Sequence, residues 1–128
     1  MAHQILIIDD DSRNIFALSA VLKSRGFSCQ SCSGAKEAIE FLSGNHPIDV
    51  ILMDMMMPEM DGYEAIPLIR SLPGCEKKPI ISVTAQAMVG DREKCLAVGA
   101  DDYLSKPIDV DRLMQLLNHY CHDRRPRT

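Results

Sequence analysis

Short apolar stretches alternate along the chain with longer segments in which apolar residues recur every three or four positions. The stretch from Ile5 to Ile8 is apolar at every position, as expected of a central strand in a parallel sheet that is covered on both faces. The longer segments are typical of amphipathic helices, and glycine or proline follows most of them. The pattern predicts strands at about 3–9, 27–31, 50–53, 80–83 and 102–104. It predicts helices at about 12–25, 34–43, 61–72, 88–98 and 109–121, the first of them capped by Asp11 or Ser12.

The third predicted helix contains a proline, Pro67. Proline has no backbone N–H and crowds the preceding turn, which costs about 3 kcal/mol unless the helix is kinked or begins late. We therefore expect this helix to be irregular.

Strands that alternate with helices predict one open parallel α/β sheet, with right-handed crossovers that place helices on both faces. Sheets of this kind bind ligands beyond the carboxyl ends of their strands. Polar side chains follow four of the five predicted strands, namely Asp9, Asp10, Asp11, Asp54, Thr84 and Lys106. Carboxylates, a hydroxyl and an ammonium group are thus expected to converge at one edge of the sheet.

Composition limits the function classes. At 128 residues, with 46% apolar and 25% charged residues, the chain fits one globular domain, which we place at residues 1–122, followed by a disordered tail at 123–128. A net charge of −4 gives no indication of nucleic-acid binding, and no segment resembles a membrane span or a signal peptide, so we expect a cytoplasmic domain without membrane contact. Five scattered cysteines favour reduced thiols. Cys29 and Cys32 are expected on opposite faces of a strand, which argues against a shared metal.

The polar set suits magnesium and phosphoryl chemistry. Mg²⁺ takes oxygen ligands, commonly one or two carboxylates, and Asp10 and Asp54 fit that role. The three consecutive acids at 9–11 repel one another unless a cation offsets their charge; the alternative is that one caps the following helix and the others are solvated. A carboxylate can also act as the nucleophile in phosphoryl transfer, with Mg²⁺, Lys106 and Thr84 each neutralising a phosphoryl oxygen.

Four stretches of sequence resemble the CheY-like response-regulator receiver domains of two-component signalling, especially the receivers of hybrid histidine kinases. They are ILIIDDDSRN, ILMDMMMPEMDGYEAI, PIISVTAQA and GADDYLSKPID, in the order and spacing of the family, over about residues 3–120. The resemblance implies a flavodoxin-like (βα)5 fold, a doubly wound five-stranded parallel sheet with strand order 2-1-3-4-5.

The resemblance also implies a cofactor site. Asp54 would accept the phosphoryl group and bind Mg²⁺, or Mn²⁺ in its place. Asp10 would be a direct metal ligand, Asp9 would act through water, and Met56 would contribute its backbone carbonyl. Asp11 would not be a ligand.

Further residues would bind phosphate or switch conformation. Thr84 and Lys106 would bind phosphoryl oxygens, and the Lys106-Pro107 peptide is expected to be cis. Movement of Thr84 toward the phosphoryl group would let the ring of Tyr103 turn inward. Met56 and Gln86 would affect the lifetime of the phosphoryl group.

The implied partners are proteins. The phosphodonor would be a phosphohistidine on a histidine kinase or a histidine phosphotransfer protein, and the signal would pass through the last two helices and the last strand to a downstream protein or a fused output domain. The chain would assist only its own phosphorylation and dephosphorylation, without turnover as an enzyme. Two alternatives remain open: a haloacid dehalogenase-type phosphatase, which would use Asp9 and Asp11, and a degenerate receiver that acts as an interaction module.

Overall fold

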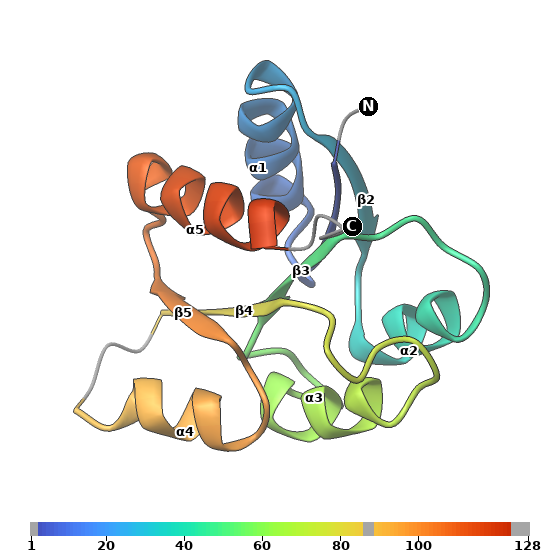
Figure 1. Ribbon diagram of the computed structural model, residues 1–128. Helices are drawn as coiled ribbons and strands as arrows, with labels where there is room; N and C mark the ends of the chain where they lie inside the picture. Colours follow the sequence, from blue (N-terminus) through green and yellow to red (C-terminus); the bar gives the residue numbers. More distant parts are fainter. Residues whose placement is uncertain (1–2, 86–88, 124–128) are drawn as a thin grey trace.

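The computed structural model describes residues 3–85 and 89–123, in which strands and helices alternate strictly (Figure 1). The strands are β1 (Gln4–Ile8), β2 (Ser28–Cys32), β3 (Val50–Asp54), β4 (Ile80–Thr84) and β5 (Asp102–Ser105). The helices are α1 (Ser12–Ser24), α2 (Ala35–Ser43), α3 (Gly62–Arg70), α4 (Asp91–Ala97) and α5 (Val110–Asp123). Gln86 and residues 124–128 of the predicted tail lie outside the described residues, whereas Asp123, predicted to begin the tail, is the last residue of α5.

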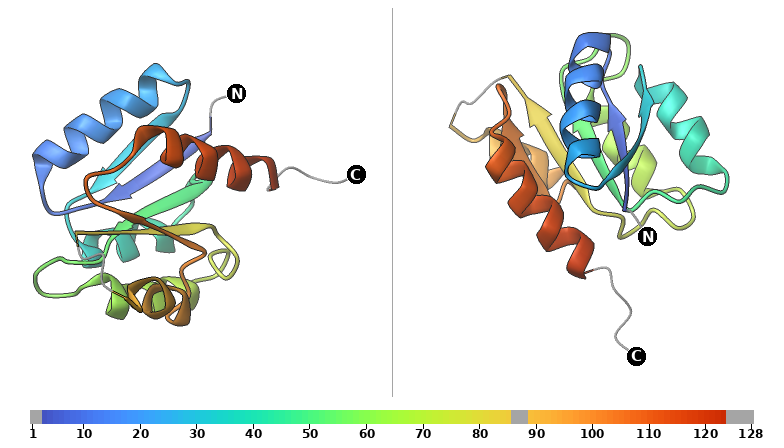
Figure 2. Two further views of the ribbon diagram at one scale, coloured as in Figure 1. Left: turned by 90° about the vertical axis from the view of Figure 1, so that its left-hand side faces the viewer. Right: turned by 90° about the horizontal axis from the view of Figure 1, so that it is seen from above.

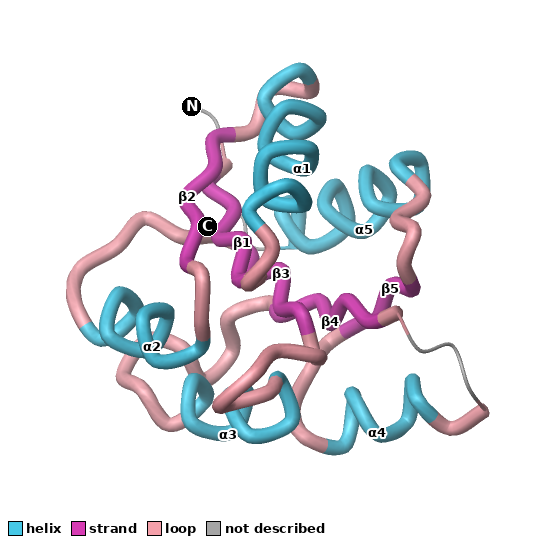
Figure 3. Tube along the Cα trace, turned by 180° about the vertical axis from the view of Figure 1, so that it is seen from behind, coloured by secondary structure: helices cyan, strands magenta, loops and turns pink. Residues whose placement is uncertain are grey.

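The five strands form one parallel sheet in the order β2-β1-β3-β4-β5, which confirms the predicted fold class; Figure 3 shows this order from behind. From β1 the chain first adds a strand on one side and then, with β3, on the other. The strand order therefore reverses between β1 and β3, and ligands of open α/β sheets bind at such a point. Ile8 lies opposite Met53 in the register, so the residues that follow, Asp9 and Asp54, are neighbours at the carboxyl edge.

Helices cover both faces of the sheet, with α1 and α5 on one face and α2, α3 and α4 on the other (Figures 1 and 2). The alternation of side chains along β1 fills both layers, because Ile5 and Ile7 pack under α1 and α5 while Leu6 and Ile8 pack under the other three helices. All four are buried, which explains the unbroken apolar run. In the part of the chain that is described, none of the helices combines the length and apolar character that a membrane crossing requires.

The ends of α4 and α5 differ by one to three residues from the predicted ends. Helix α4 begins at Asp91, three residues later than predicted, because Gly90 has a left-handed φ of 92° that cannot continue a helix. It ends at Ala97, one residue early, and Val98 caps it. Helix α5 begins at Val110 because Asp109 accepts hydrogen bonds from the N–H groups that follow it, and it runs two residues beyond the predicted end.

Helix α3 continues through Pro67, so the expected irregularity does not interrupt the helix. A capping box secures its start: the Asp61 carboxylate accepts from the Glu64 N–H at 2.9 Å, and the Glu64 carboxylate accepts from the Asp61 N–H at 3.3 Å. The helix ends at Arg70, two residues short of the predicted end, because the Leu72 N–H turns back to the carbonyl of Ile69.

The cysteines behave as the sequence predicts. All five are reduced, and no disulfide is present in the described structure. Cys29 packs in the layer under α1 and α5, and Cys32 packs in the layer on the opposite face of the sheet. The two thiols therefore cannot share a metal ion.

Candidate functional site

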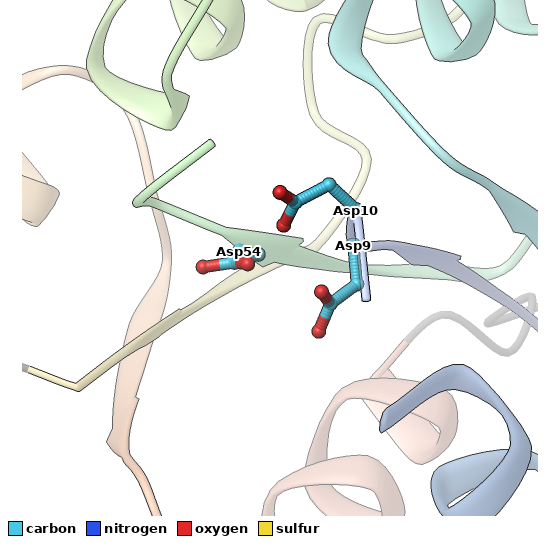
Figure 4. Close-up of side chains that lie close together, drawn as sticks. All are labelled: Asp9, Asp10 and Asp54. Atoms are coloured by element: carbon cyan, nitrogen blue, oxygen red, sulfur yellow. The ribbon is translucent and has the colours of Figure 1, made fainter. Parts of the chain in front are cut away.

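Three carboxylates meet at the carboxyl edge of β1 and β3 (Figure 4). Asp9 and Asp10 follow β1, and Asp54 ends β3; one oxygen of each lies within 4.8 Å of the others. Asp9 and Asp54 are almost completely buried, whereas Asp10 is exposed. Oxygen ligands at this spacing are the donor set that a hard divalent cation prefers, so the residues present fit such a cation.

The third consecutive acid has a different role. The Asp11 side chain accepts a hydrogen bond from the Arg13 N–H at 2.9 Å and is the N-cap of α1. Of the two predicted caps, Asp11 and Ser12, Asp11 is the one that the structure shows. The Asp11 N–H also donates to Oδ1 of Asp9 at 2.9 Å, which holds the Asp9 carboxylate in place.

Lys106 is the cation that faces these acids. Its Nζ lies 3.5 Å from Oδ2 of Asp54 and 3.7 Å from Oδ2 of Asp9, and the side chain is only partly exposed. The Lys106 N–H donates to the Thr84 carbonyl at 2.8 Å, which ties the end of β5 to the end of β4. The Lys106-Pro107 peptide is cis, as expected.

The environment of Asp54 raises its pKa to about 6. Burial is the largest cause, because it disfavours the charged carboxylate, and the nearby Asp9 carboxylate acts in the same direction. The Met56 N–H, which donates to Oδ1 of Asp54 at 3.0 Å, and Lys106 act against the rise. A bound cation would favour the charged form of Asp54 and so lower its pKa.

The remaining predicted residues occupy consistent places. Thr84 is buried at the end of β4, beside the strand that carries Asp54. Tyr103 is half-buried on β5 and packs against the layer under α2, α3 and α4, and burial raises its pKa. The Met56 side chain is exposed, so it is not part of the packing around the carboxylates.

One contact was not predicted from the sequence. Nδ2 of Asn14, in the first turn of α1, lies 3.5 Å from Oδ2 of Asp9 and donates to it. Its position five residues after Asp9, on the first turn of the helix that follows β1, is the only signal that the sequence offers.

Comparison with known proteins gives the family. Residues 5–118 match the response regulator receiver domain. The chain is 40% identical over 120 residues to the signal transduction histidine-protein kinase BarA of Escherichia coli K12, covering 94% of this chain and 13% of the kinase. It is 38% identical over 124 residues to the hybrid signal transduction histidine kinase G of Dictyostelium discoideum, covering 91% of this chain and 4% of the kinase.

A solved structure supports the same conclusion. It is the receiver domain of the sensor histidine kinase PA1611 from Pseudomonas aeruginosa PAO1, with a magnesium ion coordinated in its active site cleft. It matches with a TM-score of 0.86 at 34% identity and covers 95% of this chain and 99% of that one.

The chain belongs to the response regulator receiver domain family. The resemblance to receivers of histidine kinases is confirmed, and the chain spans only a small part of the two kinases that it matches. It is a signalling domain with a phosphoacceptor role in phosphorelay. Asp11, which the phosphatase alternative requires beside Asp9, caps α1.

Proposed function

We propose that Asp54 accepts a phosphoryl group from a phosphohistidine of a histidine kinase or a histidine phosphotransfer protein. The observation that carries this proposal is the burial of the Asp54 carboxylate next to Lys106 and within 4.8 Å of two further carboxylates. In the transfer, a carboxylate oxygen of Asp54 forms a bond to phosphorus while the bond from phosphorus to the histidine nitrogen breaks. The histidine leaves as neutral imidazole after taking up a proton, and an acyl phosphate remains on the chain.

The acids around Asp54 would hold the metal. Asp10 and Asp54 would ligate Mg²⁺ or Mn²⁺ directly, Asp9 would act through water, and Met56 would contribute its backbone carbonyl. When bound, the metal neutralises charge that develops on the phosphoryl oxygens. The Asp11 N–H and the Asn14 amide both donate to the Asp9 carboxylate and hold its orientation.

Two groups on the neighbouring strands would bind phosphoryl oxygens. Lys106 already lies 3.5 Å from Asp54 and would contact an oxygen of the acyl phosphate as an ion pair. The Thr84 hydroxyl would donate to another oxygen, and its movement would change the β4–α4 connection. Tyr103 would then turn inward, and the face formed by α4, β5 and α5 would pass the change to a downstream protein or a fused output domain. The chain would have no turnover on a separate substrate.

An apolar groove lies beside this site and would receive the donor protein. A cavity of about 540 Å³ between α1 and the β5–α5 connection is lined by Asp9 and Lys106 at one end, and elsewhere mainly by apolar side chains such as Val21 and Ile108. Because the groove is continuous with the site, a donor bound there would bring its phosphohistidine to Asp54.

The proposal is tested by intact-mass spectrometry after incubation with acetyl phosphate, with and without Mg²⁺. We expect one phosphoryl group per chain, only with Mg²⁺ and not in Asp54→Asn. The matched control is Glu40→Gln, which makes the same carboxylate-to-amide change on the exposed side of α2 and should be phosphorylated like the wild type. Absence of any addition to the wild-type chain would refute the proposal and favour the interaction module.

A further inference from the structure

The side chain of Arg70, at the end of α3, makes five hydrogen bonds far from the phosphoacceptor. We call Arg70 and the residues that it binds the hub. Its guanidinium donates to the Gly99 carbonyl from Nε at 3.1 Å and from Nη2 at 2.7 Å, and from Nη2 to Oδ2 of Asp101 at 2.8 Å. From Nη1 it donates to the carbonyls of Cys75, at 3.0 Å, and Lys78. All five N–H donors of the guanidinium are therefore in use.

The groups that Arg70 binds belong to the segments that connect α3 to β4 and α4 to β5. Gly99 ends the turn after α4 with a φ of 118°, and a Cβ there would lie 3.2 Å from Ile66 and 3.5 Å from Cγ of Arg70. A glycine therefore lets the turn pack tightly against α3 and its carbonyl reach the guanidinium. The arginine thus holds the end of α4 against the end of α3.

Asp101 extends the hub to β4, β5 and α5. The same Oδ2 that receives Arg70 also accepts the Ile80 N–H at 2.8 Å, and the Asp101 N–H donates to the Ile80 carbonyl at 2.8 Å. The Tyr120 hydroxyl of α5 donates to the Asp101 carbonyl at 3.0 Å and contacts Oδ2 of Asp102 at 3.2 Å. Arg70 is thus connected to all three elements of the α4, β5 and α5 face.

The hub lies at the edge of the sheet opposite to the phosphoacceptor. Ile80 is the first residue of β4 and Asp101 directly precedes β5, whereas Thr84 and Lys106 are found at the other ends of these strands. Strands of four or five residues separate the two edges by roughly 15 Å. Both α4 and β5 therefore have one end near Asp54 and the other end held by Arg70.

We propose that Arg70 is a positioning residue that fixes the far end of the α4, β5 and α5 face, so that the response to phosphorylation pivots about this end. The inference rests on the proposed function, because it concerns how a change that starts at Asp54 reaches the surface. With the far end fixed, movement of the β4–α4 connection tilts α4 and β5 together. Without the hub, the same movement loosens the turn around Gly99 and is not transmitted.

The test compares the response to phosphorylation in the wild type, Arg70→Lys and Asp101→Asn. Lysine keeps the charge but offers three donors from one point, so it cannot hold the carbonyls of Cys75, Lys78 and Gly99 together. Asparagine keeps an acceptor for the Ile80 N–H but loses the ion pair with Arg70. The control is Leu42→Ala, which removes buried packing in α2 but removes no hydrogen bond of the hub. Each chain is treated with acetyl phosphate and Mg²⁺, its phosphorylation is measured by intact mass, and hydrogen exchange is followed before and after.

We expect all four chains to be phosphorylated to the same extent. The change in exchange over residues 91–105 on phosphorylation should fall about fivefold or more in Arg70→Lys, a typical magnitude for a lost coupling. It should fall less in Asp101→Asn, which keeps the four hydrogen bonds from Arg70 to backbone carbonyls, and should persist in Leu42→Ala. A full wild-type change in both hub variants would overturn the inference, as would an equal loss in Leu42→Ala, which would mark a general effect of stability. If Arg70→Lys does not fold, Arg70→Gln replaces it, because the two donors of its amide also cannot hold the carbonyls of Cys75, Lys78 and Gly99 together. Failure of the wild type to be phosphorylated would instead refute the proposed function, and the inference with it.

Discussion

The raised pKa of Asp54 makes a stability prediction that is independent of phosphorylation. Burial and the Asp9 carboxylate raise this pKa from the ordinary 3.8 to about 6 in the folded chain. A carboxyl group whose pKa is higher in the folded state contributes stability that is fully present below pH 3.8 and is lost as the pH rises through 6. The difference of about two pH units corresponds to about 3 kcal/mol of unfolding free energy.

Replacement of Asp54 by asparagine removes this contribution, because asparagine has the shape of the carboxyl group and never ionises. We expect Asp54→Asn to equal or exceed the wild type in stability above pH 7, and the wild type to regain up to about 3 kcal/mol relative to the variant between pH 7 and pH 4. The assay is urea unfolding followed by far-ultraviolet circular dichroism across this range, in EDTA so that no cation binds the three acids.

A stability difference between the two chains that stays constant from pH 4 to pH 7 would refute the reasoning, and so would one that changes in the opposite direction. Addition of Mg²⁺ at pH 7 provides an internal check. A cation that binds only the folded wild type at one hundred times its dissociation constant adds about 2.7 kcal/mol, and this gain should be much smaller in Asp54→Asn.

Three further outcomes are expected. Thr84→Ala should still be phosphorylated on Asp54 but lose the accompanying change in hydrogen exchange over α4 and β5; a retained change would contradict the switch. Val21→Ser, in the lining of the groove, should slow transfer from a phosphorylated histidine phosphotransfer protein about tenfold or more, the scale of a lost interface anchor, and leave acetyl phosphate uptake unchanged; equal effects on both donors would argue against docking in this groove. Ser82→Ala should leave the unfolding free energy unchanged or raise it by about 1 kcal/mol in urea titrations, because the buried Ser82 hydroxyl has no hydrogen-bond partner among the described residues; a large loss would show that it is satisfied after all.

The position of the site was predictable from sequence because parallel strands place their carboxyl ends at one edge. The apolar run Ile5 to Ile8 identified a central strand, and the acids directly after it and after β3 had to lie at the edge where the strand order reverses. The spacing of apolar residues likewise predicted all five helices, because burial of one face requires it. These features depend on residue type and on short-range periodicity.

The tertiary structure decided what depends on distances between remote segments. The contacts of Asp9 with both Lys106 and Asn14, and the extent to which burial raises the pKa of Asp54, follow from how the strands and α1 pack together. The start of α4, directly after Gly90, depends on a backbone angle that a glycine permits but does not require.

Arg70 shows most clearly what the sequence does not predict. In the sequence it is an ordinary basic residue at the end of an amphipathic helix, where a cation is favoured and usually solvated. Four of its five hydrogen bonds go to backbone carbonyls of residues 75, 78 and 99, and every residue type carries a carbonyl. The sequence by itself therefore determined which functional groups lie together at the carboxyl edge of the sheet. Only the tertiary structure decided which remote segments are held together, because a hydrogen bond to a backbone carbonyl does not depend on the side chain of the accepting residue.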